Sequence, residues 1–112
     1  MNKIRVLILG MSGNVSQGIL KAIRNSGLDC YIVGACVFSD TEGLYLCDKA
    51  YTSPYAISKE FIPWLVDLCV SERIKIVFSG VEEIIDALSP VREQLLHETG
   101  AIFRASSPNK LE

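Results

Sequence analysis

Two short polar stretches hold the residues whose types and spacing can support chemistry. The first, Gly10-Met11-Ser12-Gly13-Asn14, follows an apolar run and precedes a helical pattern. Glycine permits positive φ angles and close approach of a ligand or another segment. A strand, a glycine turn and a helix N-terminus together offer N–H groups and a dipole that favour an anion. These residues are therefore candidates for substrate or anion binding, while a tight, closely packed turn explains the glycines equally well.

The second stretch lies near residue 80. Ser79 and Gly80 end another apolar run, and Glu82 and Glu83 stand at the start of the next helical pattern. Open parallel sheets bind ligands at the carboxyl ends of their strands, so these residues are expected at the same edge as the glycine loop. They are further candidates for substrate binding. Carboxylates at a helix start are also stabilised by its dipole without any ligand, and that interpretation competes for both glutamates.

Several known chemistries lack their motifs in this sequence. The spacing G-x-x-G-x-x-x-x-G departs from the dinucleotide-binding G-x-G-x-x-G, and Cys36 stands about where an acidic residue would hold the ribose. A Walker lysine, a nucleophilic triad and a zinc-ligand spacing are all missing. The cysteines are expected to be small buried hydrophobes. His97 is expected in the last turn of a helix, where a cation suits the dipole. We therefore predict no catalytic residue and no metal ligand.

Composition narrows the class of protein. The chain has 112 residues, 49% of them hydrophobic and 21% charged, which is typical of a single soluble domain spanning residues 1–112. A net charge of -2 without a basic stripe argues against nucleic acid. No apolar run approaches the roughly 20 residues of a membrane span, and the N-terminus lacks a signal-peptide pattern. A cytoplasmic location and no membrane contact are the expectation.

Strand and helix patterns alternate along the chain. Apolar runs predict strands at residues 4–9, 30–35, 49–52, 74–78 and 101–105. Helical periodicity predicts helices at 14–26, 58–71 and 81–98, with one helical turn near 43–46. Ser89-Pro90 predicts a break in the last helix, and Gly100 its C-terminal cap. The alternation predicts an α/β, doubly wound, Rossmann-like five-stranded parallel sheet with helices on both faces.

Finer expectations concern the first helix and its loop. Asn14 is expected to cap this helix, with Gln17 completing a capping box. Gly18 is expected to let the helix sit close on the sheet, and Gly13 to approach other backbone more closely than Gly43 does. Glu72 is expected on a solvated helix face. The sheet-facing stripe of the first helix is expected to hold Val15, Ile19, Ala22 and Ile23.

Taken in order, many of these segments match a known family. The chain resembles the N-terminal, pre-ATP-grasp domain of ATP-grasp carboxylate–amine ligases, with the large chain of carbamoyl-phosphate synthase and its smaller relatives as the comparison. The likeness covers nearly all of the chain. Its segments are Arg5-Val6-Leu7-Ile8-Leu9-Gly10, Tyr31-Ile32-Val33-Gly34-Ala35, Gly43-Leu44-Tyr45, Asp48-Lys49-Ala50-Tyr51 with Pro54, Phe61-Ile62, Leu65, Leu68-Cys69, Ile74-Lys75-Ile76-Val77-Phe78, Val91-Arg92-Glu93 and Ser106-Ser107-Pro108.

The resemblance implies a substrate-cleft domain that is catalytically incomplete alone. Enzymes of this family use ATP and Mg²⁺ to activate a carboxylate as an acyl phosphate and then transfer it to an amine or ammonia. ATP and Mg²⁺ would belong to a downstream ATP-grasp domain of the same chain, and no cofactor is expected in residues 1–112. The chain is thus interpreted as a fragment of a longer ligase. Many relatives have an acidic residue near Cys36 and a proline near Ser79, so the substrate stays open.

The expected partners follow from the same resemblance. They are the downstream domain and a small carboxylate or amine substrate. A face that normally meets the missing domain would be apolar and would promote self-association into a homo-oligomer. Two alternatives are an NAD(P)- or nucleotide-binding Rossmann domain of an oxidoreductase and a noncatalytic, flavodoxin-like interaction or ligand-sensing module.

Overall fold

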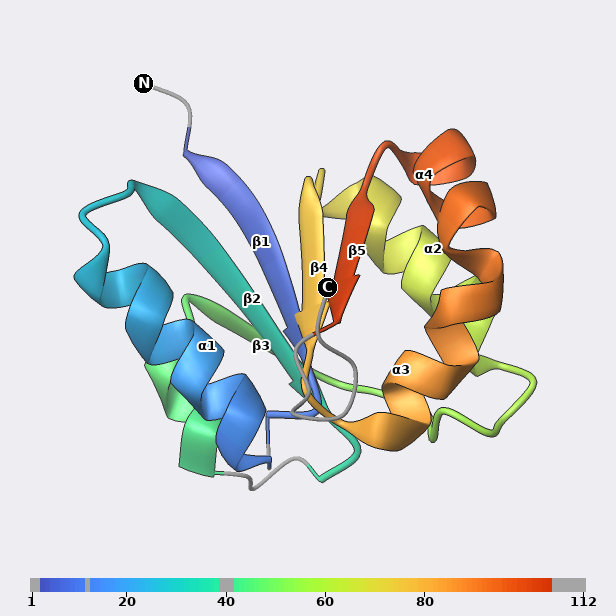
Figure 1. Cartoon of the computed structure of the whole chain (residues 1–112), viewed down its shortest axis with the longest axis horizontal. Coiled ribbons are helices and arrows are strands. Elements are labelled where there is room, and N and C mark those ends of the chain that lie inside the picture. Colours follow the sequence, from blue (N-terminus) through green and yellow to red (C-terminus); the bar gives the residue numbers. More distant parts are fainter. Residues whose placement is uncertain (1–2, 12, 39–41, 106–112) are drawn as a thin grey trace.

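Strands and helices alternate from one end of the described chain to the other (Figure 1). The structure is a computed structural model that describes residues 3–11, 13–38 and 42–105. The strands are β1 (Ile4–Leu9), β2 (Cys30–Cys36), β3 (Lys49–Thr52), β4 (Ile76–Ser79) and β5 (Ile102–Ala105). The helices are α1 (Asn14–Asn25), α2 (Phe61–Ser71), α3 (Glu82–Leu88) and α4 (Arg92–Thr99), with 3-10 turns η1 (Glu42–Leu46) and η2 (Ser89–Val91).

All neighbouring strands pair in parallel in one five-stranded sheet of order β3-β2-β1-β4-β5. The central strand is β1, whose Val6 pairs with Ile32 of β2 and with Ile76 of β4. The predicted Rossmann-like parallel sheet is therefore confirmed. The order matches the first strands of the dinucleotide-binding fold, whereas a flavodoxin-like chain has the order 2-1-3-4-5. The flavodoxin-like topology is accordingly wrong.

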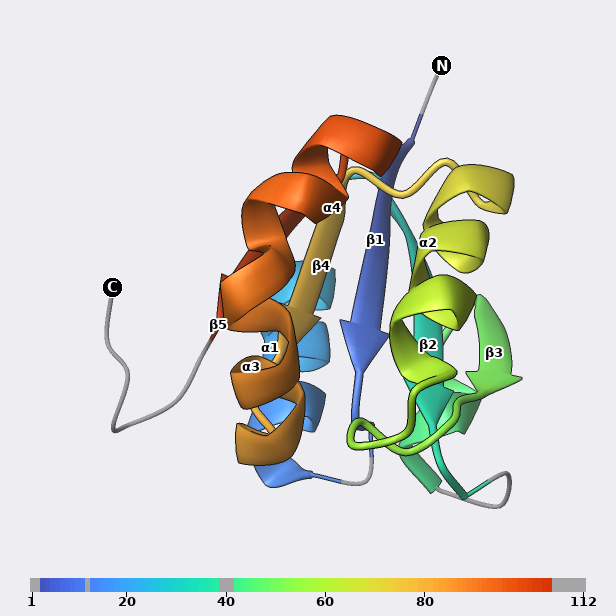
Figure 2. The same ribbon diagram turned by 90° about the vertical axis from the view of Figure 1, so that its right-hand side faces the viewer.

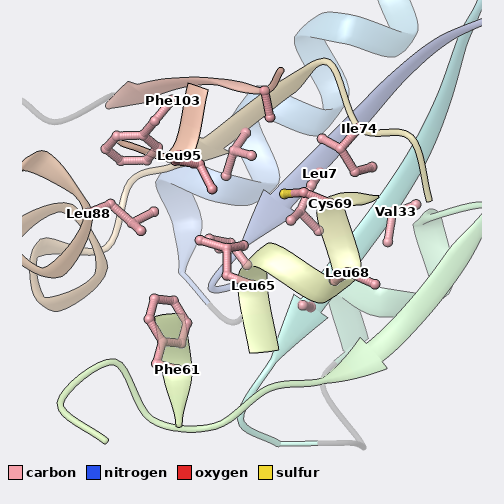
Figure 3. Close-up of a cluster of buried hydrophobic side chains, with 14 of the residues drawn as sticks. Leu7, Val33, Phe61, Leu65, Leu68, Cys69, Ile74, Leu88, Leu95 and Phe103 are labelled. Atoms are coloured by element: carbon pink, nitrogen blue, oxygen red, sulfur yellow. The ribbon is translucent and has the colours of Figure 1, made fainter. Parts of the chain in front are cut away.

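The two faces of the sheet carry different helices (Figure 2). Helices α2, α3 and α4 cover one face, and α1 with η1 covers the other. Side chains alternate along β1, so Leu7 and Leu9 pack toward α2 whereas Val6 and Ile8 pack toward α1. The larger core lies on the α2 side (Figure 3). There α2 buries Phe61, Leu65, Leu68 and Cys69.

The last helical region is broken where the sequence predicts. Helix α3 ends before Ser89, Pro90 lies within η2, and α4 begins at Arg92. Proline has no N–H for an interior helical hydrogen bond and its ring clashes with the preceding turn, so the helix must restart. Gly100 ends α4 with a φ of 78°, and its N–H donates to the carbonyl of Leu96 at 2.8 Å. Both expectations are confirmed.

The start of α1 differs from the expected capping box. Gly13 is the N-cap, no side chain caps the helix, and Asn14 is already its first helical residue. A side chain inside the first turn does not take the N-cap position, so the predicted role of Asn14 is wrong. Gln17 instead donates from Nε2 to the carbonyl of Met11 at 3.0 Å. The loop is thus held by a side chain that reaches backwards from the helix.

The face that α1 presents to the sheet also differs. The side chains that it buries or half-buries there are Ser16, Ile19, Leu20 and Ile23. Ser16 is drawn to the sheet because its hydroxyl donates to the carbonyl of Leu9 at 2.9 Å. Val15 and Ala22, expected inside, are exposed. Gly18 is exposed as well, and nothing lies within 4 Å of where its Cβ would be, so its predicted close packing is wrong.

No helix in the described ranges has the length and hydropathy to cross a membrane. Cys30, Cys36 and Cys69 are buried, which confirms their interpretation as small hydrophobes, and Cys47 is half-buried.

Candidate functional site

The carboxyl edge of the sheet carries a hollow of about 290 Å³. We call it the carboxyl-edge hollow. The ends of β1 and β2, the segment after β3 and the start of α3 form its walls, which confirms that these strand ends share one edge. Its lining residues are Gly10, Cys36, Val37, Ser53, Pro54, Tyr55, Ala56, Ile57, Val81, Glu83 and Ile84. Most of these side chains are apolar.

Gly10 combines an unusual backbone angle with close packing. Its φ is +70°, a region that side chains rarely adopt, and an added Cβ would lie 2.4 Å from Cγ2 of Val81. Glycine therefore lets Val81, directly before α3, pack over the end of β1. The packing of Val81 requires a glycine here whether or not a ligand is bound.

The amides of the glycine loop already have partners inside the chain. The N–H groups of Gly10 and Met11 both donate to the carbonyl of Ala35, at 2.9 and 3.2 Å. The N–H of Gly13 donates to the carbonyl of Gly10 at 3.0 Å. An anion at these three amides would have to replace an internal hydrogen bond. The Met11 side chain is fully buried in the core beneath α1, and Ser12 lies outside the described residues.

Ser79 and Ser16 form a hydrogen-bond network around the carbonyl group of Leu9. Both hydroxyls donate to the carbonyl oxygen of Leu9, at 3.2 Å from Ser79 and 2.9 Å from Ser16. The Ser79 hydroxyl accepts from the N–H of Val81, and the Ser16 hydroxyl accepts from the N–H of Gly80, both at 3.2 Å. We call this the Leu9 network. It uses the polar groups of Ser79 and Gly80 to fix the turn between β4 and α3.

The two glutamates of α3 lie differently. Both belong to its first turn and both are exposed, but only Glu83 lines the hollow. Glu83 is the charged side chain among the described lining residues. Asn14 is exposed on α1 and, like Glu82, does not line the hollow. Of the predicted binding residues, Gly10 and Glu83 therefore share the hollow. A binding role stays a prediction for all of them.

Sequence reasoning missed the apolar wall that follows β3. Tyr55, Ala56 and Ile57 belong to no helix or strand, yet all three line the hollow. The side chain of Ile57 is 91% exposed and that of Tyr55 is 60% exposed. The available signal was Ser53-Pro54, which ends a strand and so had to lie at the carboxyl edge. Apolar residues directly after such a strand end are candidates for a ligand wall.

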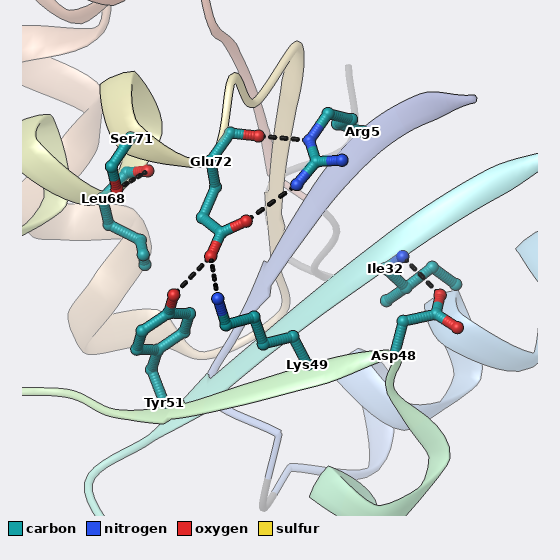
Figure 4. Close-up of polar contacts among 8 residues, drawn as sticks. All are labelled: Arg5, Ile32, Asp48, Lys49, Tyr51, Leu68, Ser71 and Glu72. Atoms are coloured by element: carbon teal, nitrogen blue, oxygen red, sulfur yellow. Dashed lines mark hydrogen bonds and ion pairs between the residues drawn. The ribbon is translucent and has the colours of Figure 1, made fainter. Parts of the chain in front are cut away.

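A second polar cluster surrounds Glu72 at the end of α2 (Figure 4). Its carboxylate accepts from Arg5 Nη2 at 2.7 Å, from Lys49 Nζ at 2.9 Å and from the Tyr51 hydroxyl. Glu72 is only 6% exposed, so the expected solvated face is wrong. The guanidinium of Arg5 also lies 4.2 Å from the ring centroid of Tyr31. This Glu72 cluster ties α2 to β1 and β3.

Hydrogen bonds within this cluster stabilise the charged forms of Glu72 and Lys49. Burial alone would raise the pKa of Glu72, but hydrogen bonds from Tyr51, Lys49 and Arg5 outweigh it and lower the pKa. The hydrogen bond with Glu72 raises the pKa of Lys49. All three donors are used within the cluster, which has the chemistry of a structural clamp.

The remaining titratable groups show no catalytic arrangement. Burial raises the pKa of Cys69 to about 12 and that of Cys47 to about 11, so both thiols are protonated near neutral pH and are poor nucleophiles. His97 lies in the last turn of α4 as predicted. Within residues 3–11, 13–38 and 42–105, no group of three or more His, Cys, Asp or Glu side chains is placed to hold a metal.

Comparison with known proteins supports the fold. No protein-family model matches the chain, and no curated protein matches its sequence. Among solved structures, it is similar to glycinamide-RNase-transformylase T from Mycobacterium tuberculosis, with a TM-score of 0.61 and 15% identity. The match covers 90% of this chain and 28% of the transformylase chain. The likeness shows a shared fold over about a quarter of a longer protein.

Proposed function

We propose that this chain is the N-terminal substrate-cleft domain of an ATP-dependent carboxylate–amine ligase of the ATP-grasp type. The ordered sequence segments described above support it. The five-stranded parallel sheet and the likeness to the transformylase support its coarser part, a fold related to that of ATP-grasp enzymes. The carboxylate–amine reaction is the finer part and rests on the sequence resemblance.

The observation that carries the proposal is the carboxyl-edge hollow. Three strand ends and the start of α3 meet around it, at the edge where open α/β sheets bind ligands. Of its lining residues, Tyr55 and Ile57 are 60% and 91% exposed, and Phe38, which follows the lining residue Val37 in the sequence, is 54% exposed. A second domain that closes over this edge would cover these side chains and complete the cleft. In its absence, the same surface favours the self-association that we predict.

This chain contributes binding rather than bond chemistry. The described residues provide no cluster for Mg²⁺, and three loop amides that could face a nucleotide phosphate are occupied within the chain. The described residues therefore do not fit ATP or Mg²⁺. Their contribution is an apolar wall and a carboxylate, Glu83, that orients a small substrate.

Two experiments test the proposal. The coding sequence beyond residue 112 should encode a lysine, then a glycine-rich hairpin and later an acidic pair on strands; a different continuation would contradict it. Thermal melts of the 112-residue chain should show no shift with millimolar ATP and Mg²⁺. Binding at a hundred times the dissociation constant would add about 2.7 kcal/mol, which raises the midpoint by roughly 10 °C or more.

The oxidoreductase alternative keeps one observation in its favour. The strand order β3-β2-β1-β4-β5 matches five of the six strands of the dinucleotide-binding fold, whose order is 3-2-1-4-5-6. The same melts with NADH or NADPH discriminate the two functions. A clear rise with a reduced nicotinamide cofactor would favour the oxidoreductase over the ligase. A rise with ATP that a Gly13→Val variant loses would indicate that the glycine loop itself binds a nucleotide.

A further inference from the structure

We infer that the carboxyl-edge hollow binds the amine-bearing substrate, through its ammonium group, rather than the carboxylate substrate or a phosphate. The inference goes one step beyond the proposed function. It rests on that function only for the identity of the two reactants, an amine and a carboxylate. It assigns a chemical class to the ligand from the residues that line the hollow.

The charge of the lining is the first argument. Glu83 contributes a carboxylate, and no lysine, arginine or histidine is among the described lining residues. A carboxylate or phosphate entering the hollow would meet a like charge, which disfavours it, whereas an ammonium would meet an opposite charge at short range. Glu83 is exposed, so water and salt screen this attraction, and a severalfold preference for the ammonium is expected.

The hydrogen-bond donors give the second argument. Anions bind where backbone N–H groups are free, but Gly10, Met11 and Gly13 already donate within the loop. The N–H groups of Gly80 and Val81 donate to the two serines of the Leu9 network. These five amides are thus directed into the fold, and Glu83 adds a carboxylate acceptor to the lining.

The size and polarity of the hollow indicate the character of the rest of the ligand. A volume of about 290 Å³ lies at the lower end of ligand pockets, which run from roughly 300 to 1,000 Å³. The walls formed by Val37, Pro54, Ala56, Ile57 and Ile84 are apolar. A small molecule with a short aliphatic or aromatic body and one primary ammonium group fits both features.

The test compares three probes that share one carbon skeleton. The 15N-labelled 112-residue chain is titrated near neutral pH with 3-methylbutylammonium, 3-methylbutanoate and 3-methylbutanol, and backbone amide shifts are followed by NMR. We expect the ammonium probe to shift the amides of Gly10, Val37, Tyr55 and Glu83 and to bind at least threefold more tightly than the alcohol. We expect the carboxylate probe to bind more weakly than the alcohol.

Two matched variants test whether the Glu83 carboxylate is the group that binds the ammonium. Glu83→Gln should weaken ammonium binding at least threefold, whereas Glu82→Gln, one position away and outside the lining, should leave it unchanged. Melts of both variants show that they are folded. Tighter binding of the carboxylate probe, equal effects of the two variants, or no shifts with any probe would overturn the inference. None of these results bears on the downstream coding sequence, so the proposed ligase function stands or falls separately.

Discussion

Arg5 and Glu72 are 67 positions apart in the sequence, yet Nη2 of Arg5 donates to Oε1 of Glu72 at 2.7 Å. Nε of Arg5 also donates to the main-chain carbonyl of Glu72, so the guanidinium holds both the side chain and the backbone at the end of α2. Lys49 and Tyr51 complete the carboxylate's partners from β3. Because Glu72 is almost fully buried, this cluster bears strongly on stability.

Replacing Glu72 by alanine should lower the free energy of unfolding by about 2 kcal/mol or more, because it leaves Arg5 and Lys49 without their anion. The cost stays below that of a fully buried pair, since the Lys49 side chain is 50% exposed. Urea unfolding measures the effect. The matched control is Asp67→Ala on the exposed side of α2, where a change within about 0.5 kcal/mol is expected. Equal losses in both variants would contradict the clamp.

Acid should weaken the fold through the same carboxylate. The folded-state pKa of Glu72 is lowered, although burial opposes this, by hydrogen bonds from Tyr51, Lys49 and Arg5. A lowered folded pKa means that the stabilisation is complete above the unfolded pKa, about 4.3, and is lost as the pH falls through the folded value. Unfolding free energies measured from near neutral pH down to about pH 3 should therefore fall. In Glu72→Gln the fall should be smaller.

The glycines of the first loop and of η1 should differ in their tolerance of a side chain. A Cβ on Gly43 would lie 2.7 Å from the carbonyl oxygen of Met11, whereas one on Gly13 would meet Val81 at 3.4 Å and the carbonyl of Gly10 at 3.5 Å. The premise that Gly13 approaches backbone more closely is therefore wrong. Gly43→Ala should cost about 1–3 kcal/mol through overpacking, and Gly13→Ala about 1 kcal/mol or less. Thermal melts that rank them in reverse would contradict the structure.

The thiols should be inert in the folded chain. Burial raises the pKa of Cys69 to about 12 and of Cys47 to about 11, and Cys30 and Cys36 are buried. A chromogenic disulfide reagent at about pH 8 reacts with thiolates, so labelling should be slow until denaturant is added. All 4 cysteines should then react. Rapid labelling of any one thiol in the native chain would show local opening that the packing does not explain.

Local patterns predict most of the fold because its elements follow local rules. Continuous apolar runs such as residues 4–9 occur where a strand is covered on both faces, and Pro90 and Gly100 act on the backbone in their own immediate surroundings. The same reasoning places Gly10 and Glu83 at one edge of the sheet. These features need no knowledge of distant partners.

The predictions are wrong where contacts with residues distant in the sequence determine how a side chain lies. Glu72 has the sequence context of an exposed helix end, but its partners come from residues 5, 49 and 51. Ser16 lies on the buried side of α1 because the carbonyl of Leu9 accepts its hydroxyl, and helical periodicity of apolar residues does not include such a bond. The apolar wall at Tyr55 and Ile57 belongs to a loop, for which periodicity gives no signal.

The central place of β1 has a consequence for how the chain is made. One edge of β1 pairs with β2, which ends at Cys36, but its other edge pairs with β4, which begins only at Ile76. A ribosome that adds roughly 5–20 residues per second needs several seconds to synthesise the stretch between them. During that time the nascent chain presents the unpaired backbone edge of a strand with mostly apolar side chains, which is a site for chaperone binding and for mispairing with another nascent copy.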